Sequence, residues 1–545
     1  MRVEIWVLIF HGGFQMSQKF PISKLTLALL TLPLASLSHA AGLDRSGQDT
    51  TAFFQDGTYA EAVYTYVDAD VTGVDNKGNK TGDIAEAYDF FRYGVKTDVN
   101  DRFSVGVLYD EPWGAAAKYR GDNEFTGVAG DVGVGAILGV AEGAIAKTQG
   151  KINDFNKQIE AIDKELEDED LTPERGGVLA LNKFVLEKGM GGLEEAVDRF
   201  ETLGKPENAT LEEYNALIET TRGKIEELEG TLEQMAPFLP EETKQLAQGL
   251  LDGNKADLAQ TEGARDAVAN LLSIDEATNV EVRSNTLSLI GGAKFGANNQ
   301  FQIYGGPVAQ RLKADVKLRG NAYQGATGYN AHVAPDIDYG YLLGFSYSKP
   351  EIALKAALTY RSEIDHSLAA YENFPALAIK GQNPESYNKF EVTTPESVNF
   401  DFQTGINPTT LATAKVRWVP WSDFKISPPV YSGAAQVPLV DYSDDQWVVE
   451  LGLGKRLADN LAVSGSIGWD SGAGDPTSSL GPIEGYYSVG LGAKYDVTKN
   501  WAVSAGGKYL WFGDAKGSLP TGDIVSNFED NEGYIVGVKL SYQDK

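Results

Sequence analysis

The chain has 545 residues, a formal net charge of -30 and no cysteine. The acidic balance argues against a nucleic-acid-binding protein, because phosphate binding needs a basic surface, and the lack of cysteine excludes disulfides and thiolate metal sites. After the first forty residues no apolar run approaches the roughly 18 residues that a membrane-spanning helix needs, so a helical membrane protein is excluded.

The N-terminus has the pattern of a secretory signal peptide. A short basic stretch precedes an apolar stretch, residues 25–37, and small residues follow up to Ala40 at the spacing of a cleavage site. We therefore interpret residues 1–40 as a signal peptide. Because a start at Met16 would give a more usual length, residues 1–15 are interpreted as an over-extended start. Export of a cysteine-free acidic chain fits a Gram-negative secreted protein.

Segments of about ten residues with alternating side chains follow from Tyr59 and again from Val280 to the end. Between Trp501 and Trp511, large apolar residues occupy every second position apart from one glycine, and small or polar residues lie between them. A closed barrel in a bilayer needs such strands, because lipid contacts one face, a polar lumen contacts the other, and aromatic residues mark both interfaces. Fourteen strands are predicted, at 59–70, 86–98, 102–112, 278–295, 300–318, 338–348, 352–364, 391–406, 411–424, 446–457, 461–470, 485–497, 501–514 and 532–543.

The connections alternate between short turns, such as 458–460 and 498–500, and long loops, such as 425–445 and 517–530. Outer-membrane barrels have short periplasmic turns, long external loops and an even number of strands. The pattern predicts an all-β transmembrane barrel of fourteen antiparallel strands in the outer membrane of a Gram-negative bacterium, with both termini periplasmic. We expect a monomer in contact with outer-membrane lipids and lipopolysaccharide.

The segment 137–276 has a different pattern, with apolar residues spaced three and four apart. This spacing predicts amphipathic helices with coiled-coil-like seams, and Thr210 with Glu213 forms a candidate capping box. The segment carries 31 acidic and 14 basic residues, hence a net charge of -17, which solvated helix faces explain best. The strand count places it in an extracellular loop. The expected domains are 1–40 (signal peptide), 41–58 (short plug segment), 59–136 (strands one to three), 137–276 (helical insertion) and 277–545 (strands four to fourteen).

The strand half from Asn279 to the end resembles the FadL/TodX-type outer-membrane transporters of long-chain fatty acids and hydrocarbons. Five stretches carry the resemblance: LTYRSEI (358–364), TTPESVNFDFQTGI (393–406), KVRWVPWSDFK (415–425), DDQWVVELGLGKRLADNLAVSGSIGWDSGAGDP (444–476) and KYLWFGDAKG (508–517). The resemblance implies passive uptake of hydrophobic small molecules, with capture in extracellular loops and lateral exit through the barrel wall. The residues themselves give little support for catalysis, and we expect no enzyme activity, cofactor or metal.

Two features depart from that family's pattern. Family members carry an N-terminal hatch of roughly forty residues, usually with an Asn-Pro-Ala element, whereas residues 41–58 are few and lack it. Phe53 and Phe54 in this segment either plug the lumen as a remnant hatch or anchor the first strand. The helical block is the second departure, and the resemblance gives it no role.

The end of the third strand carries the candidate gate. Proline removes a ladder donor, so Pro112 and Gly114 either open the wall sideways or merely end the strand. In the family that this chain resembles, a kink in the third strand breaks the strand pairing and opens the barrel wall sideways. Trp113 and Tyr119, from the same segment, are candidate ligand-binding aromatic residues.

The apolar segment 369–379, which we expect to be a loop, precedes the eighth strand, where the family places part of its capture groove. Phe374, Leu377 and Ile379 there either line a ligand groove or pack against the barrel mouth. Lys355 and Arg361 share the small-residue face of one strand, so both point into the lumen.

These two cations either pair with a fatty-acid carboxylate or belong to a structural network in which Glu363 is the expected partner.

Other chemistry has weak signals. His332 and His366, which follow the signal peptide, show neither metal-ligand nor catalytic-triad spacing. The loop 75–83 misses the EF-hand pattern and is interpreted as a plain turn. Two alternatives to transport stay open: a surface-binding or adhesion protein that uses the helical block and has the barrel as its anchor, and, less favoured, a barrel phospholipase.

Overall fold

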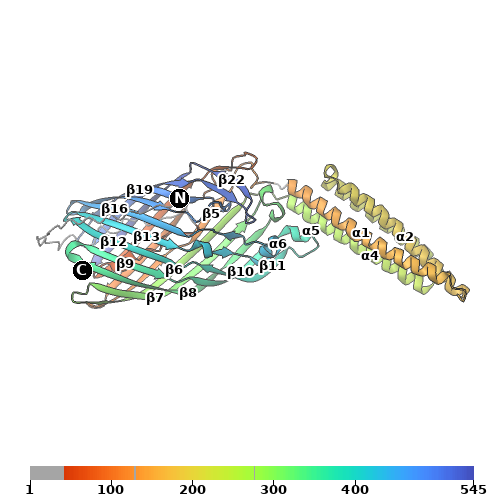
Figure 1. Ribbon diagram of the computed structural model, residues 1–545, viewed down its shortest axis with the longest axis horizontal. Helices are drawn as coiled ribbons and strands as arrows, with labels where there is room; N and C mark the ends of the chain where they lie inside the picture. Colours follow the sequence, from red (N-terminus) through yellow and green to blue (C-terminus); the bar gives the residue numbers. More distant parts are fainter. Residues whose placement is uncertain (1–41, 128–129, 275, 545) are drawn as a thin grey trace, which may run out of the picture.

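The computed structural model describes residues 42–127, 130–274 and 276–544. The predicted signal peptide and Ala41 lie outside the described residues. A β-barrel and a bundle of long helices lie end to end (Figure 1). Among the described residues, no helix combines the length and the apolar character needed to span a membrane.

The barrel is a closed antiparallel sheet of fourteen strands, as predicted. Three of its fourteen positions consist of two consecutive strands separated by a break. In order around the wall, the strands are β1 (Thr58–Asp70), β3 (Tyr88–Asp98), β4 (Phe103–Asp110) with β5 (Gly114–Lys118), β6 (Asn279–Phe295), β7 (Phe301–Lys317), β8 (Asn330–Lys349), β9 (Leu354–Arg361) with β10 (Ile364–Asn373), β11 (Glu385–Thr394) with β12 (Ser397–Asn407), β13 (Thr410–Val419), β16 (Gln446–Ala458), β17 (Leu461–Asp470), β19 (Glu484–Asp496), β20 (Trp501–Gly513) and β23 (Glu532–Asp544). The last strand closes the barrel on the first, from Thr58 opposite Asp544 to Asp70 opposite Glu532.

The outer surface of the barrel is apolar. In β19, Tyr487, Val489 and Leu491 are 66%, 43% and 69% exposed, and the alternating residues Ser488 and Gly490 are small. Trp501 and Trp511 lie on the outer face of β20, whereas Lys508 of the same strand is buried inside with Glu450 at 2.6 Å. Large apolar side chains that face outward around a polar interior fit a lipid environment, because contact with lipid tails is favourable for them and contact with water is not.

The structure lengthens four predicted strands at one end of the barrel. The third position continues through β5 to Lys118 instead of ending at 112. β8 begins at Asn330 instead of 338, the seventh position continues through β10 to Asn373, and the eighth begins with β11 at Glu385. Pro335 argues against a strand at the start of β8 when the sequence is considered alone. It lies at a register shift between β7 and β8, where a strand tolerates a residue without an N–H group.

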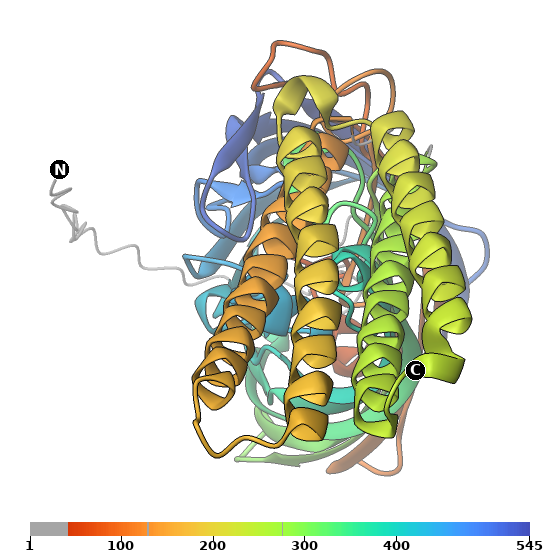
Figure 2. The ribbon, with the colours of Figure 1, turned by 90° about the vertical axis from the view of Figure 1, so that its right-hand side faces the viewer.

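Four long helices form the insertion: α1 (Gly130–Leu166), α2 (Pro173–Leu203), α3 (Leu211–Met235) and α4 (Glu241–Leu272). The Thr210 hydroxyl accepts a hydrogen bond from the Glu213 N–H at 3.2 Å, which is half of the predicted capping box. The helices form two antiparallel hairpins, α1 along α2 and α3 along α4, and α4 also contacts α1 and α2. Figure 2 shows the bundle in front of the barrel.

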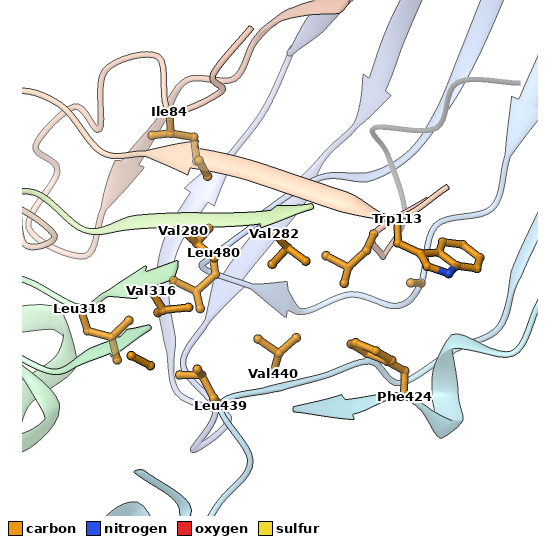
Figure 3. Close-up of a cluster of buried hydrophobic side chains, with 14 of the residues drawn as sticks. Ile84, Trp113, Val280, Val282, Val316, Leu318, Phe424, Leu439, Val440 and Leu480 are labelled. Atoms are coloured by element: carbon orange, nitrogen blue, oxygen red, sulfur yellow. The ribbon is translucent and has the colours of Figure 1, made fainter. Parts of the chain in front are cut away.

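Long loops fold over the barrel end that faces the bundle. They include a four-stranded sheet of β2 (Gly73–Asp75), β18 (Thr477–Ser478), β21 (Ala515–Ser518) and β22 (Ile524–Phe528), the two-stranded pair β14 (Lys425–Ile426) and β15 (Val440–Asp441), and the short helices α5 (Pro375–Ile379) and α6 (Pro429–Ala435). Buried apolar side chains from these loops meet side chains from the strands inside this half of the barrel (Figure 3). The end with the short turns lies opposite.

Candidate functional site

Residues 43–55, which we call the plug, lie inside the barrel. All of them are buried except Asp49, which is half-buried, although its side chain is only 7% exposed. The plug ends in a 3-10 helix, Thr51–Phe54. The short N-terminal segment therefore lies inside the barrel, although it lacks the length and the sequence element of the family's hatch.

Ion pairs attach the middle of the plug to the barrel wall. Asp49 lies 3.2 Å from Arg92 and 3.1 Å from Lys415, and Asp44 lies 2.5 Å from Arg417. Burial alone would raise the pKa of Asp49, but the two cations outweigh burial and hold this pKa below its ordinary value. Asp49 therefore stays ionised, and removing one partner of such a buried pair is costly.

Aromatic packing holds the other end of the plug. Phe53 and Phe54 are buried, and their rings lie 5.7 and 5.2 Å from the ring of Tyr304. Lys355 donates a hydrogen bond to the carbonyl of Phe54. Both phenylalanines occupy the lumen, which is the first of the two positions considered from the sequence, and Lys355 points inward as expected.

The barrel wall is broken at the predicted place on the third strand. The ladder between β3 and β4 ends at Tyr93 opposite Tyr109, and within the described residues 88–92 of β3 have no ladder partner on that side. Pro112 lies between β4 and β5, where the strand leaves the ladder. Across the break, the Glu111 carboxylate accepts a hydrogen bond from the Phe91 N–H, and beyond it Ala85 and Ala117 form an isolated β-bridge.

The plug pairs with this broken strand from the inside. The Arg45 N–H donates to the Pro112 carbonyl at 2.7 Å, and the Gly114 N–H donates to the Leu43 carbonyl at 2.7 Å. Asp44 and Trp113 form the antiparallel bridge between these two bonds. The start of the plug and the break in the wall are therefore one hydrogen-bonded unit, and displacement of one strains the other.

An apolar cavity adjoins this unit. It has a volume of about 30 Å³ and is lined by Leu43 of the plug, by Trp113 of the break and by strand and loop residues, among them Val282, Leu312, Phe390, Trp421 and Phe424. The Trp113 ring packs edge-on against Trp421 at 5.3 Å, and Arg417 lies over it at 5.5 Å.

A much larger groove, of about 840 Å³, lies outside, between the helical bundle and the loops of the barrel mouth. One wall is α1, where Gly135, Gly139 and Gly143 have no other atoms within 4 Å of an added Cβ. The facing wall combines α5 with the 3-10 helix η4 (Asn321–Ala326). The groove is also lined by Val132, Val140, Ala144, Ala264, Leu271, Ala376 and Ile379.

No family model matches the sequence, and no curated protein matches it. Among solved structures, a FadL homologue from Pseudomonas aeruginosa superposes with a TM-score of 0.54 at 11% identity, over 95% of this chain and 98% of that one. The chain has the FadL fold. The toluene transporters TodX of Pseudomonas putida (TM-score 0.45, 10% identity, 91% and 92% coverage) and TbuX of Ralstonia pickettii (0.44, 9%, 93% and 95%) are less similar.

Some of the residues predicted to bind ligand pack against other side chains of this FadL-fold barrel. Phe374 is buried and its ring lies 5.6 Å from that of Tyr329, so it packs at the mouth, and Leu377 packs against the same cluster. Tyr119 stacks on Phe125 at 4.1 Å and donates to the Ser479 carbonyl at 2.7 Å. Of the three predicted groove residues, Ile379 lines the groove.

Arg361 points into the lumen as expected, but its expected partner was wrong. Glu363 is exposed, because β9 ends at Arg361 and the chain turns before β10. Arg361 instead donates to the Ser288 hydroxyl at 3.1 Å and interacts electrostatically with Asp110.

Several residues of the FadL-fold interior gave no signal in the sequence. Leu43 and Arg45 lie in the plug without any motif, and Ser284, which accepts from the Trp113 N–H at 2.7 Å, is one serine among many on an inward face. Their partners are distant in the chain, so only the fold brings them together. In the loop 75–83, the Asp75 carboxylate accepts hydrogen bonds from the N–H groups of Lys77, Asn79 and Glu124, which supports the plain-turn interpretation.

Proposed function

We propose that this protein is a passive outer-membrane transporter for hydrophobic small molecules. The observation that carries the proposal is the pairing of the plug with the broken third strand at Pro112 and Gly114, beside an apolar cavity. A ligand that enters this cavity would compete with Leu43 and Trp113 for apolar contacts. It would thereby loosen the plug and the wall together.

In this mechanism the external groove captures the ligand first. A volume of about 840 Å³ falls within the range of small-molecule pockets, roughly 300–1,000 Å³. Each buried CH2 group contributes about 0.8 kcal/mol, so a long acyl chain gains enough to leave water. The glycine wall of α1 and the side chain of Ile379 provide the apolar contacts.

Long-chain fatty acids are the leading cargo class. Lys147 and Lys380 line the groove, and Lys380 is exposed. Lys147 already pairs with Asp257 at 2.9 Å and donates to Gln260 at 2.7 Å, so the exposed Lys380 is the ammonium group proposed to pair with a carboxylate head while the chain lies in the groove. Hydrocarbons, which need no cation, are the comparison class.

The ligand would then pass the apolar cavity and leave sideways, between residues 88–92 of β3 and residues 112–114. The gate role of Pro112, Gly114, Phe53 and Phe54 belongs to this proposal, and so do the ligand contacts of Trp113. Lateral exit delivers an insoluble molecule to a site near the barrel surface and avoids the buried ion pairs around Asp49.

The proposed orientation follows the usual asymmetry of outer-membrane barrels, which have short periplasmic turns and long external loops. The helical bundle is then extracellular, both termini are periplasmic, and the protein acts as a monomer among outer-membrane lipids and lipopolysaccharide.

The test is the initial uptake rate of a labelled long-chain fatty acid, and separately of labelled toluene, in cells with the gene deleted and then restored. We expect restoration to raise the fatty-acid rate several-fold while a labelled sugar enters at an unchanged rate. A rise in the toluene rate alone would indicate that the cargo is a hydrocarbon and not a fatty acid. If restoration changes the uptake rate of neither ligand, although the protein is present in the outer membrane, the transport proposal is contradicted.

The projecting bundle favours one second candidate, a surface-binding protein with the barrel as its anchor. The bundle extends far beyond the barrel mouth (Figure 1), and only its base contributes to the groove. Under this alternative, cell-surface attachment would depend on the bundle and ligand uptake would not.

A further inference from the structure

A second break in the barrel wall lies between the sixth and seventh strand positions. β8 pairs with β10 from Asn330 to Val333 and with β9 from Leu342 to Lys349. Residues 334–340 of β8 lie between these stretches, and within the described part of the chain they have no ladder partner on that side.

Two aspartates and a histidine face one another across this break. Asp336 and Asp338 are both on the inner face of β8, because Ile337 between them points outward and is 54% exposed. His366 comes from β10, on the other side of the break, and is fully buried. The three ligand atoms, one from each side chain, lie within 4.8 Å of one another.

The hydrogen bonds of His366 fix the direction in which its free nitrogen points. Its Nε2 lies 3.1 Å from Oε1 of Gln310, and this oxygen also accepts from the Thr394 hydroxyl at 2.8 Å. The amide nitrogen of Gln310 donates to Thr286 at 3.3 Å, so Oε1 is the acceptor and Nε2 carries the proton. In the neutral ring, Nδ1 then holds a lone pair.

That lone pair points at negative charge. The His366 Nδ1 has no hydrogen-bond partner among the described residues, and it lies 4.0 Å from Asp336 and 3.9 Å from Asp338, too far for hydrogen bonds. Asp336 and Asp338 are close enough to each other to share a proton, and the unpaired His366 Nδ1 points toward them. A metal cation could take the place of that proton and bind all three electron donors.

We propose that Asp336, Asp338 and His366 bind a divalent transition-metal ion, with zinc as the ion of choice. One imidazole nitrogen and two carboxylate oxygens suit zinc, and the hydrogen bond from Nε2–H to Gln310 is the usual support of a metal-binding imidazole. Tetrahedral zinc with bonds of about 2.1 Å needs ligand atoms about 3.4 Å apart, so small side-chain rotations close the site. The two carboxylates are each about one-third exposed (35% and 33%), so an ion can reach them.

The bound ion would join β8 to β10 where the ladder is interrupted. The Asp338 carboxylate already links the two strands, because it accepts a hydrogen bond from the Ser367 N–H of β10 at 3.3 Å. A metal bridge between the two strands would stabilise this part of the wall independently of the break at Pro112.

The test uses the detergent-solubilised mature chain, purified without a histidine tag, titrated with zinc against a competing chelator. We expect one zinc ion per chain, and a loss of affinity of at least about 100-fold in Asp336→Asn and in Asp338→Asn. Zinc should raise the thermal unfolding midpoint of the unsubstituted protein and leave that of the two variants unchanged.

His332→Gln is the matched control. His332 lies 2.6 Å from Asp315 on neighbouring strands, but it has no third ligand in the part of the chain that the structure describes, and its loss leaves His366 as the sole histidine after residue 40. Zinc binding at one ion per chain in this variant, with cobalt absorption bands typical of nitrogen and oxygen ligands, would support the proposal. Absence of stoichiometric zinc in His332→Gln would overturn it even if the aspartate variants failed to fold, and so would equal affinity in folded Asp338→Asn.

Discussion

Inside the lumen, glycines leave the space that plug side chains occupy. A Cβ added at Gly94 would lie 2.8 Å from Ala52, and one at Gly106 would lie 2.9 Å from Phe53. Real Cβ atoms do not come this close to ring or methyl carbons, so the missing side chains are what allow the plug to fit. The small residues at these positions on the inner face are therefore explained by the plug side chains that pack against them.

Gly106→Val should displace Phe53 and loosen the plug. Overpacking of this kind costs about 1–3 kcal/mol, which is comparable with the packing of one buried aromatic side chain. We expect cells that carry the variant to become several-fold more sensitive to a large antibiotic that the outer membrane normally excludes, measured as the inhibitory concentration.

The matched control is Gly291→Val. Gly291 is exposed on the outer face of β6, and an added Cβ there meets no atom within 4 Å. If both variants change antibiotic sensitivity equally, Phe53 does not seal the lumen.

At the scale of elements, alternation predicted the regular strands well and failed where strands break. β17 was predicted with the observed bounds, 461–470, because its large residues face lipid at every second position. Alternation did not predict the first residues of β8, most of β10 or the first residues of β11. Pro335 and the small residues around Ala369 interrupt the alternation of large and small side chains there. The contacts of the plug could not be predicted, since Asp49 and Lys415 are paired only by the fold.

The helix α1 carries the next prediction. Gly139→Leu should fill the groove and lower the initial uptake rate several-fold at low ligand concentration, because a leucine side chain would occupy the space proposed for the acyl chain. Leucine is a better helix former than glycine by roughly 0.5–1 kcal/mol, so a loss of uptake cannot come from a weakened helix.

Gly150→Leu is the control for this measurement. It lies on the same helix, an added Cβ there also meets no atom within 4 Å, and it does not line the groove. Equal uptake by Gly139→Leu and the unsubstituted protein would remove the groove from the transport path.

For the whole molecule, the barrel and the bundle are joined at one place in the wall. Thr126 and Ala277 form a β-bridge, and the Gly127 N–H donates to the Glu276 carbonyl at 3.0 Å, just before and just after the insertion. The two chain ends that enter and leave the bundle are therefore adjacent. An insertion with adjacent ends can be removed without stretching the strands that flank it.

Replacing residues 128–275 with a short glycine–serine linker should leave a barrel that folds and reaches the outer membrane. Because α1 and α4 form one side of the groove, we expect weaker capture: the ligand concentration at half-maximal uptake should rise about tenfold while the maximal rate stays within about twofold, which corresponds to a loss of about 1.4 kcal/mol of binding free energy. Uptake kinetics and cell-surface attachment should be measured on the same cells. Unchanged uptake with lost attachment would identify the bundle as the functional part and the barrel as its anchor, whereas loss of the maximal rate would mean that the bundle takes part in transport beyond capture.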